Sequence, residues 1–547
     1  MSDGWPRAMI APFLNSLRSM NDPLRSANAA GRWLASLPAA DVAAIQKKTV
    51  TVVARFAEGR REVGPGQVEA LLRIDARLES VLADLTRDYT ANYQTSTDVE
   101  VRLWHRVIDL VKVFTAAYQA ALRVGYPRAD DKRWRAVLPW VLVRLAYYKG
   151  LDGKFRLFRY SRWIPAQWRD FHELYEFARM RGWQREQLVF GAGKFSRPGV
   201  CLEQEYLKTL LLMRLDSGNF TADQVEWIAQ QLEDWSPTLL LEPPPGDGAS
   251  FFVDLTSAQG LRRQDQPHTG GRVLFLDANP VYTRIIENMR WVPEQDEPVA
   301  PGALPGREQR LLLMRLAALF GPDTLAIAPR ATRYAVDNDV RVVFGLQSLC
   351  AAIRATEGRS VAVARSGGGL DDAVAQERST DPDSVSGYTG SSVWRMVDAS
   401  ETGCRLSARL PDAPAKLGDV LAIRDRGAWS VGVVRRIQRT EPDEVSLGVE
   451  VIARRLVLVK LRNWTGSSTG RASDSAQSFY GIYLPAHADN RAATQRSLIG
   501  PDNQLVSGGM IELETGKARY LIRFTQTLEH QAGWSWALFS AVRNLGS

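Results

Sequence analysis

The sequence predicts a multidomain α+β protein, with a mainly helical N-terminal region, a small antiparallel β domain and a further β-rich C-terminal segment. Three observations predict this fold class. At 547 residues, the chain is longer than a single domain usually is. Up to about residue 323, the apolar residues recur at helical spacing. From about residue 324 onward they alternate with polar residues, which is the pattern of half-buried strands.

Residues 1–240 are predicted to form a helical domain. In VRLWHRVIDLVKVFTAAYQAAL, apolar residues return every three or four positions, which is typical of an amphipathic helix. Another helix is predicted to begin at Pro165 and to end near Gly182, because proline suits a first turn and glycine follows a last turn. The segment EYLKTLLLMRLDSGNFTADQVEWIAQQLEDW predicts a helical hairpin, whose second helix is capped by Thr221 or Asp223.

Residues 241–323 are predicted to be a mixed linker and helical region. The stretch LEPPPGDGAS reads as a proline- and glycine-rich loop, and the apolar runs SFFVDL and RVLFLD after it predict short strands. The segment REQRLLLMRLAALFG returns to helical spacing and ends at Gly321.

Residues 324–464 are predicted to form one small β domain. Its strand-like segments are VRVVFGLQSL, WRMVDAS, GCRLSARL, DVLAIR, WSVGVVRRI and EVSLGVEVIARRLVLVKL. Between the first two lies a polar, low-complexity stretch of about residues 355–392, which predicts a flexible insertion because it cannot bury enough apolar surface. Residues 465–547, with MIELETGKARYLIRF and WSWALFSAV, predict a second β-rich segment.

The bulk composition limits the partners and the compartment. A formal net charge of +8 favours anionic ligands but is small for a protein that coats nucleic acid, so we expect no nucleic-acid partner. The three cysteines lie far apart in apolar runs and indicate neither a disulfide framework nor a zinc site. The N-terminus lacks the pattern of a secretory signal, and the run VLPWVLVRLAYY is too short to cross a bilayer. We therefore expect a cytoplasmic protein without a membrane span.

Local motifs give no support to a catalytic or a metal site. GAGKFS (191–196) approaches a phosphate-binding loop, but Phe195 stands where a serine or threonine should hold the metal. The five histidines are scattered along the sequence, and His172-Glu173 lacks the second histidine of a zinc-protease helix. We expect no enzyme, no catalytic residue, no metal and no cofactor.

The segment WRMVDASETGCRLSARL (394–410) carries the most informative pattern. Two strand-like runs meet at an Asp-x-Ser-x-x-Gly sequence formed by Asp398, Ser400 and Gly403. A plain turn is one explanation, because aspartate and serine side chains bond to nearby backbone and glycine adopts a positive φ. A binding site is the other explanation, and the flanking sequence favours it.

Upstream, PRATRY (329–334) brings Arg330 and Arg333 directly before the first strand, and downstream GVVR (432–435) and GVE (448–450) lie in later strands. Together with the Asp-x-Ser-x-x-Gly sequence, this set resembles the PilZ domain, the bacterial receptor module for cyclic di-GMP. The resemblance implies that the β domain is a PilZ-like antiparallel β-barrel and that its ligand is cyclic di-GMP.

The resemblance also implies a ligand-binding set, formed by Arg330, Arg333, Asp398, Ser400 and Gly403. Arginines on a mobile segment would bond to the phosphates and stack on guanine. The aspartate would accept hydrogen bonds from guanine, the serine would serve base or phosphate, and the glycine would permit a close approach of the backbone.

The leading hypothesis is a non-enzymatic receptor that binds cyclic di-GMP and relays the signal through the helical region to an unidentified protein partner. A second hypothesis is that the β domain is a barrel of the same fold that binds no nucleotide and acts as an adaptor for protein interactions. Its support is that two residues separate Arg330 from Arg333, where the family has three. An enzyme hidden in the N-terminal half and a nucleic-acid binder are the remaining alternatives, and only chain length, mild charge and aromatic content favour them.

Overall fold

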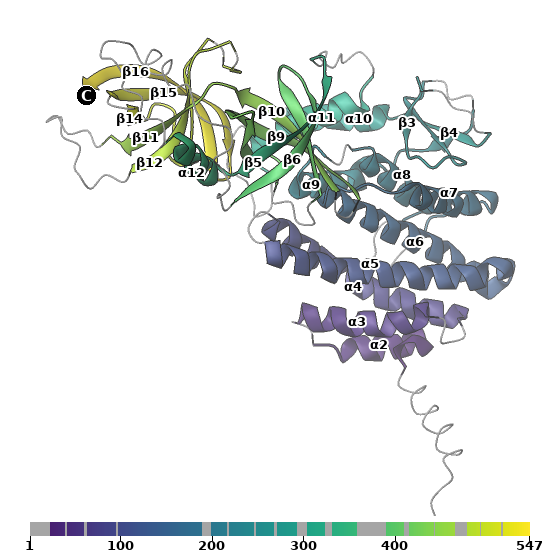
Figure 1. The fold of residues 1–547 in the computed structure, drawn as a ribbon. Helices are drawn as coiled ribbons and strands as arrows, with labels where there is room; N and C mark the ends of the chain where they lie inside the picture. The colour runs from purple at the N-terminus through teal and green to yellow at the C-terminus, as the bar shows by residue number, and fades with distance from the viewer. Residues whose placement is uncertain are drawn as a thin grey trace, which may run out of the picture. The chain divides into compact units, whose positions relative to one another are not determined.

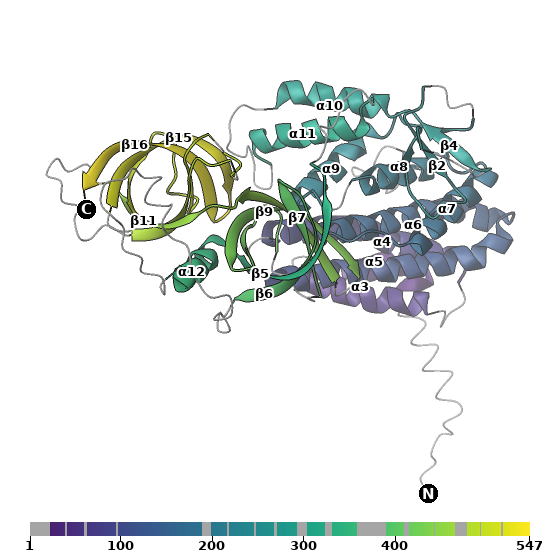
Figure 2. The same cartoon turned by 45° about the horizontal axis from the view of Figure 1, so that its top comes forward.

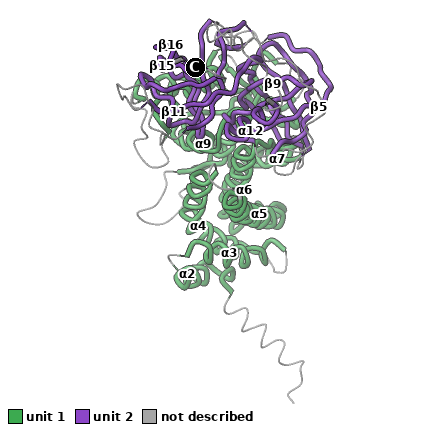
Figure 3. Tube along the Cα trace, turned by 60° about the vertical axis from the view of Figure 1, so that its left-hand side comes forward, with its two compact units in different colours: residues 1–327 green, residues 328–547 purple. Residues whose placement is uncertain are grey.

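The computed structural model divides the chain into two compact units, residues 1–327 and 328–547 (Figure 3). It describes the chain from residue 22 to residue 546 apart from the segments 39–40, 59–62, 94–96, 189–198, 216–217, 245–247, 267–270, 293–303, 323–330, 358–389, 410–414, 442–443, 465–477, 489, 493 and 516–517. The GAGKFS motif, Arg330 and most of the expected insertion at 355–392 therefore lie outside the described residues.

The first unit is mainly helical, as the sequence predicts (Figure 1). Its described helices are the short η1 (Pro23–Arg25) and η2 (Tyr126–Arg128) and the α-helices α2 (Ala27–Ala35), α3 (Val42–Ala57), α4 (Pro65–Asn92), α5 (Thr97–Gly125), α6 (Lys132–Phe158), α7 (Pro165–Met180), α8 (Leu202–Met213), α9 (Ala222–Trp235), α10 (Asn279–Trp291) and α11 (Gly306–Phe320).

Local signals in the sequence account for several of these helix ends. Helix α7 has Pro165 at its first position and is followed by Gly182, whose φ of 69° requires a glycine-like conformation. The backbone N–H of Gln224 donates to the hydroxyl of Thr221, so Thr221 is the N-cap of α9. The predictions of α7 and of the α8–α9 hairpin are confirmed.

A buried charged cluster ties α4 to α5 and α6. Asp75 is fully buried, and its two carboxylate oxygens each accept a 2.7 Å bond from Arg144, which is only 5% exposed. The hydroxyls of Tyr118 and Tyr148 donate to the same carboxylate at 2.5 and 2.6 Å. Arg144 also donates to Glu79 at 2.9 Å. The charge of Asp75 is thus matched by four donated bonds, as a buried carboxylate requires.

Residues 241–323 pack on the same core as the preceding helices. The two predicted strands are confirmed as β2 (Phe251–Asp254) and β4 (Val273–Leu276). With β1 (Leu241–Glu242) and β3 (Arg262–Arg263) they form a four-stranded antiparallel sheet in the order β1-β4-β2-β3. Helices α10 and α11 lie side by side after it (Figure 2).

The second unit contains two closed six-stranded antiparallel barrels (Figures 1 and 2). The first barrel has the strand order β10-β7-β6-β5-β8-β9. Its strands are β5 (Tyr334–Phe344), β6 (Ser391–Ala399), β7 (Gly403–Arg409), β8 (Val420–Asp425), β9 (Ala428–Glu441) and β10 (Glu444–Ala453). The predicted alternation on β7 is present, since Cys404 and Leu406 are buried while Arg405 is exposed.

The sequence predicts a strand over the whole of VRVVFGLQSL, and this prediction is wrong for its second half. Strand β5 ends at Phe344, and helix α12 (Leu346–Glu357) follows. Gly345 has a φ of 81°, which turns the chain out of the strand direction. Beyond it, Leu346, Leu349, Cys350 and Ile353 are all buried at helical spacing.

The last strand assigned to the first barrel belongs instead to the second one. The second barrel has the order β11-β12-β13-β16-β15-β14 and comprises β11 (Val457–Asn463), β12 (Ser478–Leu484), β13 (Ser497–Gly500), β14 (Met510–Thr515), β15 (Ala518–Gln531) and β16 (Trp534–Gly546). In EVSLGVEVIARRLVLVKL the alternation runs on with little interruption, yet the chain crosses between barrels at residues 454–456. There the side chain of Asn490 accepts the backbone N–H groups of Arg454 and Arg455 and donates to two carbonyls.

The two barrels pack against each other within their unit. Residues of α12, of the first barrel and of the second barrel form one buried apolar cluster that includes Ile353, Val433 and Trp534. Beside it, Arg435 of β9 donates two 2.6 Å bonds to Glu529 of β15 and one 2.7 Å bond to Glu450 of β10. None of the helices among the described residues is long and apolar enough to cross a membrane.

Candidate ligand-binding site

The Asp-x-Ser-x-x-Gly sequence forms the turn between β6 and β7, and we call residues 398–403 the corner. The turn is closed by a 2.7 Å hydrogen bond from the N–H of Ser400 to the carbonyl of Gly403. It is also tied to the end of β10, because the N–H of Val451 donates to the carbonyl of Thr402. The corner is therefore a fixed part of the barrel.

Asp398 lies between two arginines, Arg333 directly before β5 and Arg405 on β7. Its Oδ1 accepts a 2.9 Å bond from Nη1 of Arg333, and its Oδ2 lies 2.9 Å from Nε of Arg405. The Asp398 side chain is 15% exposed, whereas those of Arg333 and Arg405 are 47% and 49% exposed. The carboxylate is thus screened, while both guanidinium groups face solvent.

The strand order of the barrel explains why these three residues meet. In the β6–β7 ladder, Asp398 lies opposite Arg405, and in the β5–β6 ladder it lies opposite Ala335, two residues after Arg333. The structure thereby joins two of the predicted site residues, Arg333 and Asp398, across 65 positions of sequence.

Ser400 faces the turn. Its side chain is buried, and its hydroxyl donates a 3.1 Å bond to the carbonyl of Gly403. The same carbonyl accepts the N–H of Ser400, so the residue closes the turn with both its backbone and its side chain. This contact stabilises the shape in which Asp398 is presented.

Gly403 is required for a close approach between strands. It does not have a positive φ, unlike the turn glycines of the chain. A Cβ atom on Gly403 would lie 2.5 Å from the carbonyl oxygen of Val449 on the neighbouring β10, far inside normal contact. The glycine at this position is thus explained by the contact between β7 and β10.

We expect Gly403→Ala to destabilise the barrel unit by about 1–3 kcal/mol, because the backbone of β10 must shift to admit the methyl group. Urea unfolding followed by hydrogen exchange in peptides from the barrel strands measures this loss. Gly271→Ala is the matched control, because it adds the same methyl group at a glycine that has open space around it and no positive φ. A Gly403→Ala variant with the midpoint of the unchanged chain would contradict this account of Gly403.

Two further arginines at the corner were not among the predicted site residues. Arg405 was visible in the sequence as one of the polar positions that alternate along β7. Arg454 gave no such signal, because it follows β10 in sequence and reaches the corner only through the fold. Its Nη2 donates to the carbonyls of Ser400 and Glu401 at 3.1 and 2.9 Å.

The Cys404 thiol lies directly after the corner and is buried. Burial raises the pKa of the Cys404 thiol to about 12, so the thiol stays protonated near neutral pH. Among the described residues, no group of three His, Cys, Asp or Glu side chains could hold a metal ion.

An open pocket of about 380 Å³ lies on the outer face of the first barrel beside the corner. It is lined by Val336, Asp337, Arg395, Val397, Ser407 and Glu444. Ser407 is two residues from Arg405 on the same side of β7, and its hydroxyl donates to Glu444 at 3.2 Å. The pocket thus combines apolar, basic and acidic groups, and its Ser407 is the next residue after Arg405 on that side of β7.

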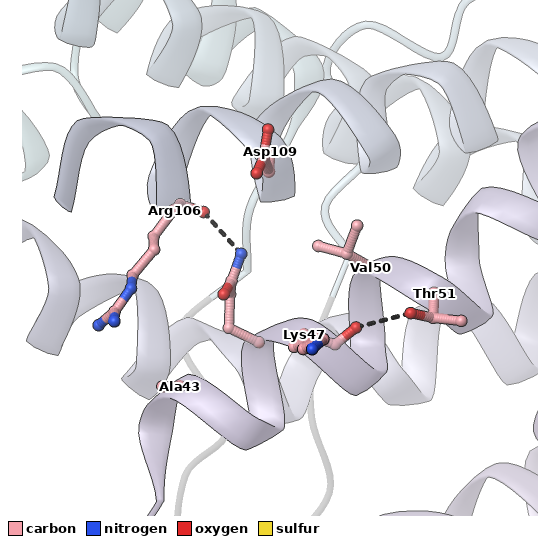
Figure 4. A pocket seen from close by; sticks show the side chains of 7 residues that line it. Ala43, Lys47, Val50, Thr51, Arg106 and Asp109 are labelled. Atoms are coloured by element: carbon pink, nitrogen blue, oxygen red, sulfur yellow. Dashed lines mark hydrogen bonds between the residues drawn. The ribbon is translucent and has the colours of Figure 1, made fainter. Parts of the chain in front are cut away.

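The helical unit has an open pocket of about 330 Å³ between α3 and α5 (Figure 4). Its lining includes Lys47, Arg106 and Asp109, and the side chain of Gln46 donates to the carbonyl of Arg106 at 3.2 Å. The charged groups are exposed and of mixed sign, so this pocket lacks the converging arginines of the corner.

Comparison with known proteins links the helical unit to cyclic di-GMP receptors. Residues 28–245 match the model of a family described as the N-terminal domain of the cyclic-di-GMP receptor FimW. The match spans α2 to α9 and lies outside both barrels. A search of the curated proteins gave no match.

A search of solved structures returned MrkH, described as a novel c-di-GMP dependence transcription regulatory factor. The alignment has 6% sequence identity and covers 40% of this chain and 91% of that chain. Its TM-score of 0.13 does not establish a common fold. The helical region of this chain is thus similar to the N-terminal domain of a cyclic-di-GMP receptor.

Proposed function

We propose that the chain is a non-enzymatic, cytoplasmic receptor that binds cyclic di-GMP at the corner of a PilZ-like first barrel. The observation that carries this proposal is the arrangement around Asp398, where two half-exposed arginines, one directly before β5 and one on β7, converge on one carboxylate. The family match of residues 28–245 supports the same ligand from an independent part of the chain.

The arginines suit the phosphates of the dinucleotide. Each phosphodiester carries one negative charge, and a guanidinium group can donate two parallel hydrogen bonds to it. The ion pairs of Asp398 involve half-exposed arginines, and such pairs contribute only about 0–1 kcal/mol each. Releasing them to a phosphate therefore costs little.

The remaining corner residues suit the guanine base and the approach of the ligand. Asp398, once released by the arginines, can accept hydrogen bonds from the N1 and N2 donors of guanine. Ser400 and Gly403 would serve the ligand by keeping the turn tight, and the pocket beside Arg405 gives room for the second half of the dinucleotide. Arg330 is proposed as a further phosphate ligand on the resemblance alone.

We assign the relay of the signal to the helical unit, which would contact a protein partner. Its support is the match of this unit to a domain of a known receptor. The barrel would carry the ligand site and the helical unit the output, as separate compact units of one chain.

A second candidate function is an adaptor that keeps the barrel without a nucleotide. One observation favours it, because Asp398 already accepts a hydrogen bond from Arg333 and forms an ion pair with Arg405 within the protein. In that case the cluster would be a surface ion-pair network with a structural role.

Calorimetric titration of the full chain with cyclic di-GMP separates the two functions. The receptor proposal predicts saturable binding, and at least about tenfold weaker binding of cyclic di-AMP, whose adenines lack the N1 and N2 donors that Asp398 would accept. Absence of heat with cyclic di-GMP would favour the adaptor. Equal affinity for the two dinucleotides would show that Asp398 does not read guanine.

A further inference from the structure

The ion pair of Arg405 with Asp398 engages only part of the Arg405 guanidinium group. It projects outward from β7 and is 49% exposed, and its contact with Asp398 is made through Nε alone. Among the described residues, neither terminal nitrogen of Arg405 has a hydrogen-bond partner. Its guanidinium therefore presents free donors to solvent beside the corner.

Arg333 has the complementary arrangement. It contacts the other oxygen of the same carboxylate through Nη1 and is 47% exposed. The two guanidinium groups thus hold the two oxygens of one anion between them. The two non-bridging oxygens of a phosphodiester offer a similar pair of acceptors, so the position suits a phosphate as well as a carboxylate.

The charges at the corner also favour an anionic ligand. Three arginines (Arg333, Arg405 and Arg454) stand against two carboxylates (Asp398 and Glu401), and the donors of Arg454 are directed at backbone carbonyls. A phosphate bound at the corner would therefore neutralise its remaining positive charge.

We infer that Arg405 is a further ligand-binding residue, which bonds to a phosphate of the dinucleotide together with Arg333. Asp398 holds both arginines in place in the free protein and gives them up to the phosphate when the ligand binds. This inference rests on the proposed function, since it names an additional contact at the same site.

The test compares Arg405→Ala with Arg409→Ala in calorimetric titrations of the full chain with cyclic di-GMP. Arg409 is a matched control because it lies on the same side of β7 and is also exposed, but has no ion pair with Asp398. Arg405→Ala is expected to weaken binding about tenfold or more, and Arg409→Ala less than about threefold. The thermal unfolding midpoints of both variants should equal that of the unchanged chain.

A second comparison distinguishes a direct contact from an effect through Asp398. The Asp-x-Ser-x-x-Gly pattern of the resemblance also admits asparagine, so Asp398→Asn removes the ion pair while keeping an acceptor for guanine. If Arg405 binds phosphate, Arg405→Ala still costs about tenfold in the Asp398→Asn background. If it only positions Asp398, the second change has no effect there, and the inference is wrong.

The outcomes separate this inference from the function on which it rests. Binding by the unchanged chain, with equal affinity for the Arg405→Ala variant, overturns the role of Arg405 and leaves the receptor function standing. Absence of binding by the unchanged chain overturns both.

Discussion

Arg333→Ala and Asp398→Ala are each expected to weaken the binding of cyclic di-GMP by about tenfold or more, while the unfolding midpoint moves by less than about 2 °C. The affinity falls because Arg333 loses its bonds to phosphate and Asp398 its bonds to guanine. The fold persists because Arg333 is half-exposed and the contacts of the Asp398 carboxylate are ion pairs with two half-exposed arginines rather than core packing. Titration calorimetry and a thermal scan of each variant provide the two measurements.

The control for this prediction is Arg523→Ala, which removes an exposed arginine from β15 of the second barrel and should leave binding unchanged. The resemblance predicts the same loss for Arg330→Ala, and no detectable binding for the double change at Arg330 and Arg333. A parallel loss of binding and of thermal stability in the Asp398 variant would instead indicate that the corner is only a structural turn.

Arg144→Met is expected to destabilise the helical unit by about 3–5 kcal/mol, the largest stability effect that we predict for a single change. The substitution keeps the apolar stem but leaves Asp75 as a buried carboxylate without its cation. The hydroxyls of Tyr118 and Tyr148 remain, and they cannot neutralise the charge. Urea unfolding followed by far-ultraviolet circular dichroism reports mainly on this helical unit.

Arg87→Met is the matched control for Arg144→Met. Arg87 also lies on a long helix and also pairs with an aspartate, Asp84, but its side chain is 71% exposed. Its loss should change the free energy of unfolding by no more than about 0.5 kcal/mol. Equal shifts in the two variants would contradict the role assigned to the buried cluster.

Features encoded by neighbouring residues could be predicted from the sequence. Helix α7 has Pro165 at its start and Gly182 after its end, and both signals are local. The alternation of β7 placed Arg405 on the outer side of the strand before any pairing was known. In these cases the residues that determine the local structure lie close together in the sequence.

Features that depend on distant partners could not be predicted in the same way. Alternation shows that β11 is a strand, yet its partners β12 and β14 make it part of the second barrel. Gly345 gave no sign in sequence that its positive φ would end β5 and precede a helix, since a glycine in an apolar run can also mark a bulge within a strand. Asp398 and Arg333 meet only because β5 and β6 pair across the long segment between them.

The contacts of the candidate site could not be predicted from the sequence either. The sequence pattern selected Ser400 and Gly403 for a ligand, whereas their contacts in the structure are with each other and with Val449. Arg454 reaches the corner from the end of β10, and no spacing in the sequence indicates this.

The central claim is that the ligand binds at the corner of the first barrel, and hydrogen exchange with and without saturating cyclic di-GMP tests it most directly. The account predicts slower exchange in peptides covering residues 331–336 and 398–405, because Arg333 and the corner would contact the dinucleotide. Peptides from α2 to α9 should change much less. Protection confined to residues 28–245, or no protection at saturating nucleotide, would contradict the assignment of the site to the barrel.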